Sequence, residues 1–198
     1  LILPTAPTSA SRAVLDLNND LVTVDTNLTS YLAPDERQFI TRGLARFIDR
    51  IFISCTRFIG VMNNNGALLL QLDVLVLQQN LKNIITTNTP DGEGQGEEQI
   101  ALPRSAKFLD WFLEGPEKAL DYAREEKELF ASQGEERGLA AGNGEPFTYD
   151  ELKVLIDLCY SELIRGPRGE QNREDYLAAR RSHGDAMLKL NEVMWDAK

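Results

Sequence analysis

Apolar side chains recur every three or four residues over most of this chain, which is the repeat of an amphipathic helix. Clusters of Gly, Pro and Asn interrupt the repeat and divide it into six predicted helices: 9–32, 34–63, 66–86, 103–131, 148–165 and 170–196. No stretch shows the strict alternation of a half-buried strand. The pattern predicts an all-α fold, an elongated bundle of about six long helices. The short links near 33–34 and 63–66 favour antiparallel neighbours.

The three N-terminal predicted helices differ in how much of their circumference is apolar. The first carries a single stripe, made of Val14, Leu17, Leu21, Val24, Leu28 and Tyr31. The second repeats through Phe39, Ile40, Leu44, Phe47, Ile48, Ile51, Phe52, Cys55, Phe58, Ile59 and Met62. The third is apolar nearly all round, so we expect it in the middle of the bundle. Its predicted buried residues are Leu69, Leu72, Val76, Leu77 and Leu81.

Local signals predict where several helices begin and end. Asn63 to Gly66 is typical of a helix end followed by a new cap. Gly115-Pro116 should kink or break the fourth helix, because proline removes a backbone donor and clashes with the preceding turn. Thr148 and Glu151 have the spacing of a capping box at the start of the fifth.

Two loops rich in glycine separate these helices, one over 88–99 and one over 132–147. The first combines glycine with acids and has no apolar anchor, so we expect little fixed structure there and early cleavage by proteases. The whole of 1–198 is interpreted as a helical-bundle region of a larger subunit. It contains possible sub-bundles 1–87 and 101–198, joined by the acidic loop 88–100.

Charge narrows the range of partners. The 198 residues carry a formal net charge of −10, with 42% hydrophobic and 26% charged residues. That composition is ordinary for a folded domain. An acidic chain repels phosphate, so nucleic acid and bare anionic membrane are poor default partners.

The cysteines and the apolar runs indicate the cellular compartment of the protein. Cys55 and Cys159 lie far apart within helical patterns, which suits buried thiols in a reducing compartment better than a disulfide framework. No signal peptide opens the chain. The longest apolar run, 67–77, falls short of the ~20 residues that a membrane span needs. We therefore expect a cytoplasmic protein without a membrane span.

No catalytic, cofactor or metal site is predicted. The one histidine, His183, lies on a charged helix and is interpreted as a surface residue, since zinc sites need three or four ligands. The loop from Asp91 to Gly96 fails as a calcium loop, because Leu102 stands where a bidentate Glu is required. It fails as a phosphate loop as well, because no strand precedes it and no Gly-Lys-Ser/Thr follows.

One polar pattern is a candidate for binding a partner. Arg42, Arg46 and Arg50 stand at i, i+4 and i+8 of the second predicted helix, with Arg57 one step further along, on the face opposite the apolar stripe. Stacked arginines could receive an acidic element of a partner through bidentate contacts. The alternative is a solvated face, partly neutralised by Asp49.

Three segments carry a resemblance to a known family. Asn65-Gly66 precedes an apolar run that reads Leu-Val-Leu-Gln-Gln-Asn-Leu-Lys-Asn-Ile over 75–84. Downstream come Ala-Lys-Phe-Leu-Asp-Trp-Phe-Leu over 106–113 and Phe-Thr-Tyr-Asp-Glu-Leu over 147–152. These segments resemble the C-terminal region of exocyst complex component four, the Sec-eight subunit. The resemblance is strongest over 58–87, and the two glycine-rich loops look like insertions.

The resemblance implies a piece of a vesicle tether. The exocyst is an eight-subunit complex of helical rods that holds secretory vesicles at the plasma membrane before fusion. The family brings no catalytic residue or cofactor. The implied partners are sibling subunits, the Sec-six subunit especially, with small GTPases acting indirectly. The implied location is the cytoplasm, peripheral at plasma-membrane sites of polarised secretion. The alternative is an independent helical adaptor or a small-GTPase effector-binding domain, which would equally lack catalytic residues.

Overall fold

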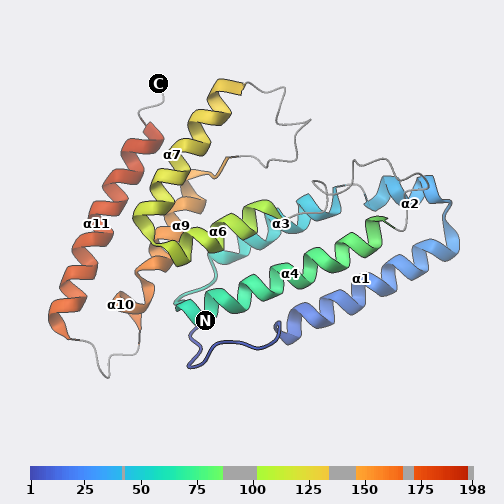
Figure 1. The fold of residues 1–198 in the computed structure, drawn as a ribbon, viewed down its shortest axis with the longest axis horizontal. Helices are drawn as coiled ribbons and strands as arrows, with labels where there is room; N and C mark the ends of the chain where they lie inside the picture. The colour runs from blue at the N-terminus through green and yellow to red at the C-terminus, as the bar shows by residue number, and fades with distance from the viewer. Residues whose placement is uncertain (42, 87–101, 134–145, 167–171, 196–198) are drawn as a thin grey trace.

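The structure, a computed structural model, describes residues 1–41, 43–86, 102–133, 146–166 and 172–195. All regular secondary structure in these ranges is helical, which confirms the predicted all-α class (Figure 1). The helices are α1 (Arg12–Tyr31), α2 (Pro34–Thr41), α3 (Leu44–Thr56), α4 (Asn64–Thr86), α6 (Pro103–Glu114), α7 (Pro116–Gln133), α9 (Tyr149–Cys159), α10 (Ser161–Arg165) and α11 (Arg173–Trp195).

The predicted count of six long helices is not confirmed, because three of the predicted helices divide. The segment 34–63 separates into α2 and α3 at Gly43, whose φ of 84° lies in the left-handed region that glycine alone adopts readily. The segment 103–131 divides at Gly115, as expected, where φ is 105° and Pro116 begins α7. The third division lies between α9 and α10, at Tyr160.

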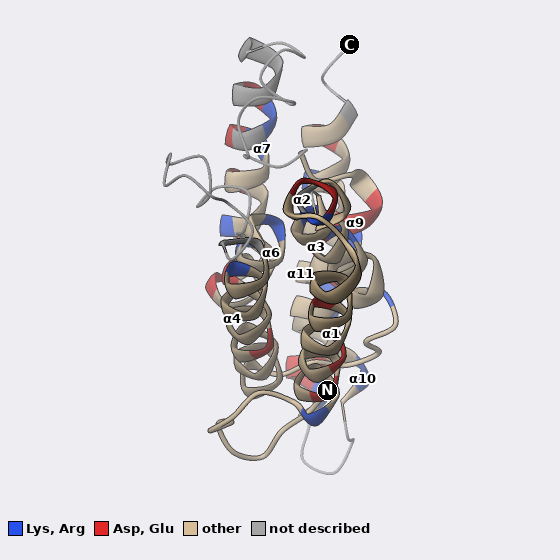
Figure 2. Cartoon of the chain, turned by 90° about the vertical axis from the view of Figure 1, so that its right-hand side faces the viewer, with Lys and Arg blue, Asp and Glu red and all other residues tan. Residues whose placement is uncertain are grey.

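The helices form two groups, which follow one another along the longest dimension of the molecule (Figure 1). In the first group α4 packs against both α1 and α6, and α6 also packs against α3. Figure 2 shows this group end on, with α4 and α6 in one column and α1, α2 and α3 in the other. The second group contains α7, α9, α10 and α11.

Helix α6 belongs to both groups, since it packs against α3 and α4 as well as α7 and α9. It supplies four large buried side chains to the hydrophobic core, Phe108, Leu109, Trp111 and Phe112. The division into sub-bundles 1–87 and 101–198 stays a prediction. The acidic loop 88–100 and most of 132–147 lie outside the described residues.

The expectation that the third predicted helix is central is only partly right. In α4, Leu77 and Leu81 are buried as predicted, whereas Leu69, Leu72 and Val76 are half-buried. Neighbouring helices cover α4 on some sides only, and Leu75 on its remaining side is 59% exposed. The central helix of the molecule is therefore α6.

Helix α1 is the outermost helix of the first group, and it has no fully buried residue. Half of its predicted stripe faces α4, and the other half, Leu17, Val24 and Tyr31, is exposed. Polar contacts complete the packing: the Asn80 side chain donates to the backbone oxygen of Asn18 at 3.2 Å.

Candidate interaction surface

Helix α3 is covered on one face, and large apolar side chains are exposed on the opposite face. Its buried residues, Ala45, Asp49, Ile53 and Thr56, lie within one arc when each residue turns the helix by about 100°. On the opposite side Phe47 is 61% exposed and Ile51 45% exposed, and Phe58, just beyond the helix, is 75% exposed. We call Phe47, Ile51 and Phe58 the outer face of α3.

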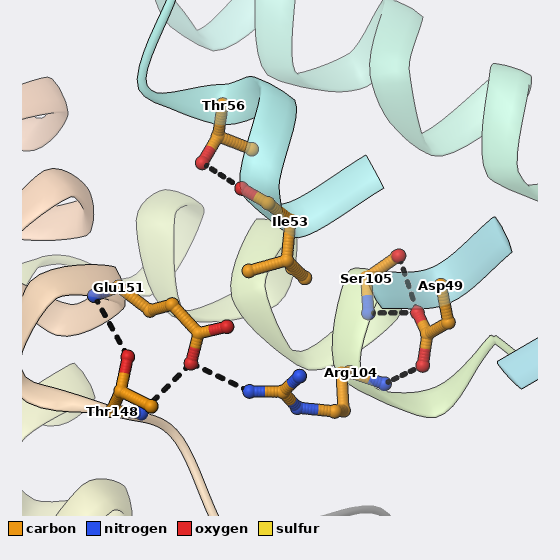
Figure 3. A network of polar contacts seen from close by, with 7 residues as sticks. All are labelled: Asp49, Ile53, Thr56, Arg104, Ser105, Thr148 and Glu151. Atoms are coloured by element: carbon orange, nitrogen blue, oxygen red, sulfur yellow. Dashed lines mark hydrogen bonds and ion pairs between the residues drawn. The ribbon is translucent and has the colours of Figure 1, made fainter. Parts of the chain in front are cut away.

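Asp49 determines which face of α3 turns inward. Its Oδ1 accepts hydrogen bonds from the backbone N–H of Ser105 at 2.8 Å and from the Ser105 hydroxyl at 2.5 Å (Figure 3). Its Oδ2 accepts one from the backbone N–H of Arg104 at 3.1 Å. Both N–H groups belong to the first turn of α6, where a helix has no internal acceptor for them. Leu102 at the N-cap position offers no side-chain acceptor, so Asp49 caps α6 from another helix.

A second set of contacts ties the start of α6 to the start of α9. The Nη2 of Arg104 lies 2.6 Å from Oε2 of Glu151, which also accepts from the backbone N–H of Thr148 at 2.8 Å (Figure 3). Thr148 and Glu151 form the predicted capping box. The Arg104 guanidinium also lies over the Phe147 ring at 4.8 Å. Three helices, α3, α6 and α9, are thereby connected through buried and half-buried polar groups.

The candidate arginines are exposed where the structure describes them. Arg46 and Arg50 lie on α3, and Arg57 follows it, whereas Arg42 lies outside the described residues. Arg46 and Arg50 each have an interaction within the chain. The Arg57 guanidinium lies 4.9 Å from the centroid of the Phe58 ring. Whether these arginines bind a partner stays a prediction.

At about 100° per residue, Arg46 and Arg50 lie opposite Ile48, which packs against the core, and about a quarter turn from the outer face. Asp49 does not neutralise them from a solvated surface, as the alternative supposed, because it is buried and its oxygens accept from the first turn of α6. The exposed apolar face could not be predicted from the sequence, because each of its residues fits the helical repeat of a core.

His183 is not a free surface residue. It is half-buried, its Nε2 lies 2.7 Å from Oδ1 of Asp157, and its ring meets the edge of Tyr160. The contact ties α11 to α9 and so has a structural role. Among the described residues, no group of three or more His, Cys, Asp and Glu side chains could hold a metal ion. The loop segment 91–96 lies outside these residues.

The two cysteines have different environments, contrary to the expectation of two buried thiols. Cys55 is exposed on α3, one turn beyond Ile51. Cys159 lies against α6, and desolvation raises the pKa of its thiol to about 12. In the part of the chain that the structure describes, no helix combines the length and the apolar character needed to cross a bilayer.

Comparison with known proteins finds two relatives. The chain is 32% identical to the probable exocyst complex component sec8 of Neurospora crassa, over 93% of the chain. It is 35% identical to exocyst complex component 4 of Dictyostelium discoideum, over 54% of the chain. It spans only 17% and 9% of the lengths of these proteins. No family model and no solved structure matches.

Proposed function

Since the chain belongs to the family of exocyst complex component four, we propose that it is a non-catalytic interaction module of a subunit that tethers secretory vesicles before fusion. The observation that carries the proposal is the 32% identity to a probable exocyst component, which extends over 93% of the chain. The family assignment agrees with the resemblance over 75–84, 106–113 and 147–152.

The structure suits a module that acts by being bound. Buried and half-buried polar contacts between α3, α6 and α9 give these helices a defined relative orientation. A fixed orientation lowers the entropy lost when a partner docks. Large apolar side chains stay exposed on α3, although the same helix buries its opposite face completely. Such a module would hold a partner without performing chemistry.

We propose that the partners are sibling subunits of the exocyst, the Sec-six subunit among them, with small GTPases acting indirectly. The segment would lie in the C-terminal region of its subunit. The proposed location is the cytoplasm, peripheral at sites of secretion on the plasma membrane. The net charge of −10 argues against nucleic acid as a partner.

The test is affinity purification of the full-length protein from its own cells, followed by mass spectrometry of the proteins that accompany it. We expect the other large helical exocyst subunits in comparable amounts. The alternative, an independent adaptor, predicts a different result: this chain alone would bind a small GTPase in a nucleotide-dependent manner. Purification without any exocyst subunit would overturn the proposal.

A further inference from the structure

The outer face of α3 is the strongest candidate for a contact surface in the described residues. Phe47 and Ile51 stand four residues apart and so share one side of the helix, which Phe58 extends beyond its C-terminal end. All three are large apolar side chains with between 45% and 75% of their area exposed. Aligned exposed side chains of this kind are typical of protein interaction sites.

The charges beside this face indicate the chemistry of its partner. Asp49 is the only acid in α3, and it is buried, so the exposed charges of the helix are those of Arg46 and Arg50. Arg57 adds a third positive charge beyond the helix end. A basic edge beside an apolar stripe, in a chain whose net charge is −10, favours a partner with the reverse arrangement.

We propose that the outer face of α3 docks an amphipathic helix of another exocyst subunit. The apolar residues of that helix would pack against Phe47, Ile51 and Phe58, and its carboxylates would face the arginines. The inference rests on the proposed function and names the chemistry of the partner. It does not need unpartnered arginines, because a guanidinium has five N–H donors and can keep an internal contact while it binds a carboxylate.

A helix fits this face better than the other occupants. From Phe47 to Phe58 the face extends over about 16 Å at 1.5 Å per residue, which about three turns of a partner helix would cover. A second copy of this chain would bring another net charge of −10. An anionic vesicle would be repelled by the same excess of acids. The acidic edge of an amphipathic helix would instead meet the arginines directly.

The exposed thiol of Cys55 provides a probe, because it lies on α3 one turn beyond Ile51. Alkylation of Cys55 by iodoacetamide would be followed by mass spectrometry of the peptide that contains this residue. The samples are the full-length protein alone and the same protein in the purified exocyst. Cys159 is the internal reference, since its raised pKa keeps it protonated in both. We expect Cys55 to react rapidly in the protein alone and about tenfold more slowly in the complex, equivalent to a protection of about 1.4 kcal/mol.

Each contrary result has a definite meaning. Rapid alkylation of Cys55 inside a recovered complex would overturn this inference and leave the proposed function intact, because recovery of the complex tests that function separately. Slow alkylation in the protein alone would also overturn it, since the occupant would then be another part of the same polypeptide or a second copy. Failure to recover any complex would instead overturn the proposed function.

A matched pair of variants tests the same face through binding. Phe47→Glu with Ile51→Glu places charges at exposed apolar positions of α3, and Leu188→Glu does so at an exposed position of α11. We expect the α3 variant to lose one sibling subunit in the purification and the α11 variant to retain all of them. Equal recovery from both would overturn the inference. The inference would also be overturned if the wild-type protein alone bound phosphatidylserine vesicles and the α3 variant did not. Circular dichroism checks the fold, and Phe47→Ser with Ile51→Ser replaces the pair if the glutamates unfold the protein.

Discussion

Asp49 of α3 accepts two hydrogen bonds from Ser105 of α6, one from its backbone N–H at 2.8 Å and one from its hydroxyl at 2.5 Å, across 56 positions of sequence. Both residues are almost completely buried, with exposures of 3% and 0%. The pair holds α3 against the start of α6. Phe47 and Ile51, on the opposite side of α3, face outward.

Removing this carboxylate should destabilise the fold. In Asp49→Ala the N–H groups of Arg104 and Ser105 lose their acceptor, and a buried donor left without one costs about 1–3 kcal/mol. We expect a total loss of about 3 kcal/mol in the free energy of unfolding, measured by urea denaturation. Asp49→Asn keeps one acceptor oxygen and should lose less. An unchanged unfolding midpoint for Asp49→Ala would show that solvent replaces the cap.

Two leucines of α4 offer a comparison of buried and exposed positions. Leu77→Ala removes a buried side chain and should cost about 2–5 kcal/mol through lost transfer free energy and the cavity left behind. Leu75→Ala removes a side chain that is largely in solvent, so we expect a change within about 0.5 kcal/mol. Thermal unfolding of the two variants measures the difference. Equal losses would mean that the outer side of α4 is covered.

Replacing either of two glycines by alanine should change the free energy of unfolding, in opposite directions at the two positions. Gly43 has a φ of 84°, so Gly43→Ala forces an L-residue into the left-handed region and should cost about 1–2 kcal/mol. Gly184 is exposed within α11, and nothing would obstruct an added Cβ. Gly184→Ala should stabilise the chain by about 0.5–1 kcal/mol. Urea denaturation of both variants measures the two changes in the free energy of unfolding. A stabilising effect of Gly43→Ala would contradict the helix break at that position.

The two thiols should differ strongly in reactivity. Thiolate is the reactive form, and the pKa of Cys159, raised to about 12 by burial, leaves almost none of it at pH 8. Cys55 is exposed and should react with Ellman's reagent in the native chain, whereas Cys159 should react only after unfolding. In the unfolded chain the Cys159 thiol has its ordinary pKa of 9.0, so the contribution of its burial to stability should fall as the pH rises from about 9 towards 12. Rapid reaction of both thiols in the native chain would contradict the packing of Cys159 against α6.

The local features of the fold were predictable from the sequence. Thr148 and Glu151 form the expected capping box, and Gly115 with Pro116 ends one helix and begins the next. These signals act between residues that are close in sequence. The family was likewise recognisable, because the run 75–84 is a continuous segment.

The roles of the buried acids were not predictable, because their partners are distant in sequence. Asp73 of α4 accepts a hydrogen bond at 2.6 Å from the backbone N–H of Ser11, the N-cap residue of α1, across 62 positions. Asp49 likewise binds the start of α6, through the N–H groups of its first turn. In the sequence Asp73 stands alone in an apolar run, and Asp49 stands beside Arg50. Nothing local distinguishes a buried cap from a solvated charge.

The outer face of α3 was missed for a related reason. Residues such as Phe47 and Ile53 have the same apolar character, and the helical repeat does not specify which of them a neighbouring helix covers. Which face of α3 is covered depends on the position of α6, which follows α3 by nearly fifty residues. The arginines lie beside this face, about a quarter turn around the helix.

The arginines themselves can be tested by reversing their charge. Arg42→Glu, Arg46→Glu and Arg50→Glu together should leave the helical content unchanged by circular dichroism, because Arg46 and Arg50 are exposed. We expect the recovery of the subunit with the complex to fall, and to fall further at low salt, where Coulomb interactions are least screened. Exposed ion pairs are worth about 0–1 kcal/mol each, so a partial loss is expected. Normal recovery of a folded triple variant would mean that these arginines form only a solvated edge.

Photo-cross-linking from position 47 determines directly whether another subunit binds this chain. Phe47 would be replaced by benzoylphenylalanine in the full-length protein, which keeps an aromatic side chain at an exposed position, and the same group at Leu188 would serve as the control. After irradiation in cells, mass spectrometry identifies the captured protein. We expect position 47 to capture one particular exocyst subunit and position 188 not to capture it. Capture of the protein's own chain at position 47, or of nothing while the complex is intact, would contradict it.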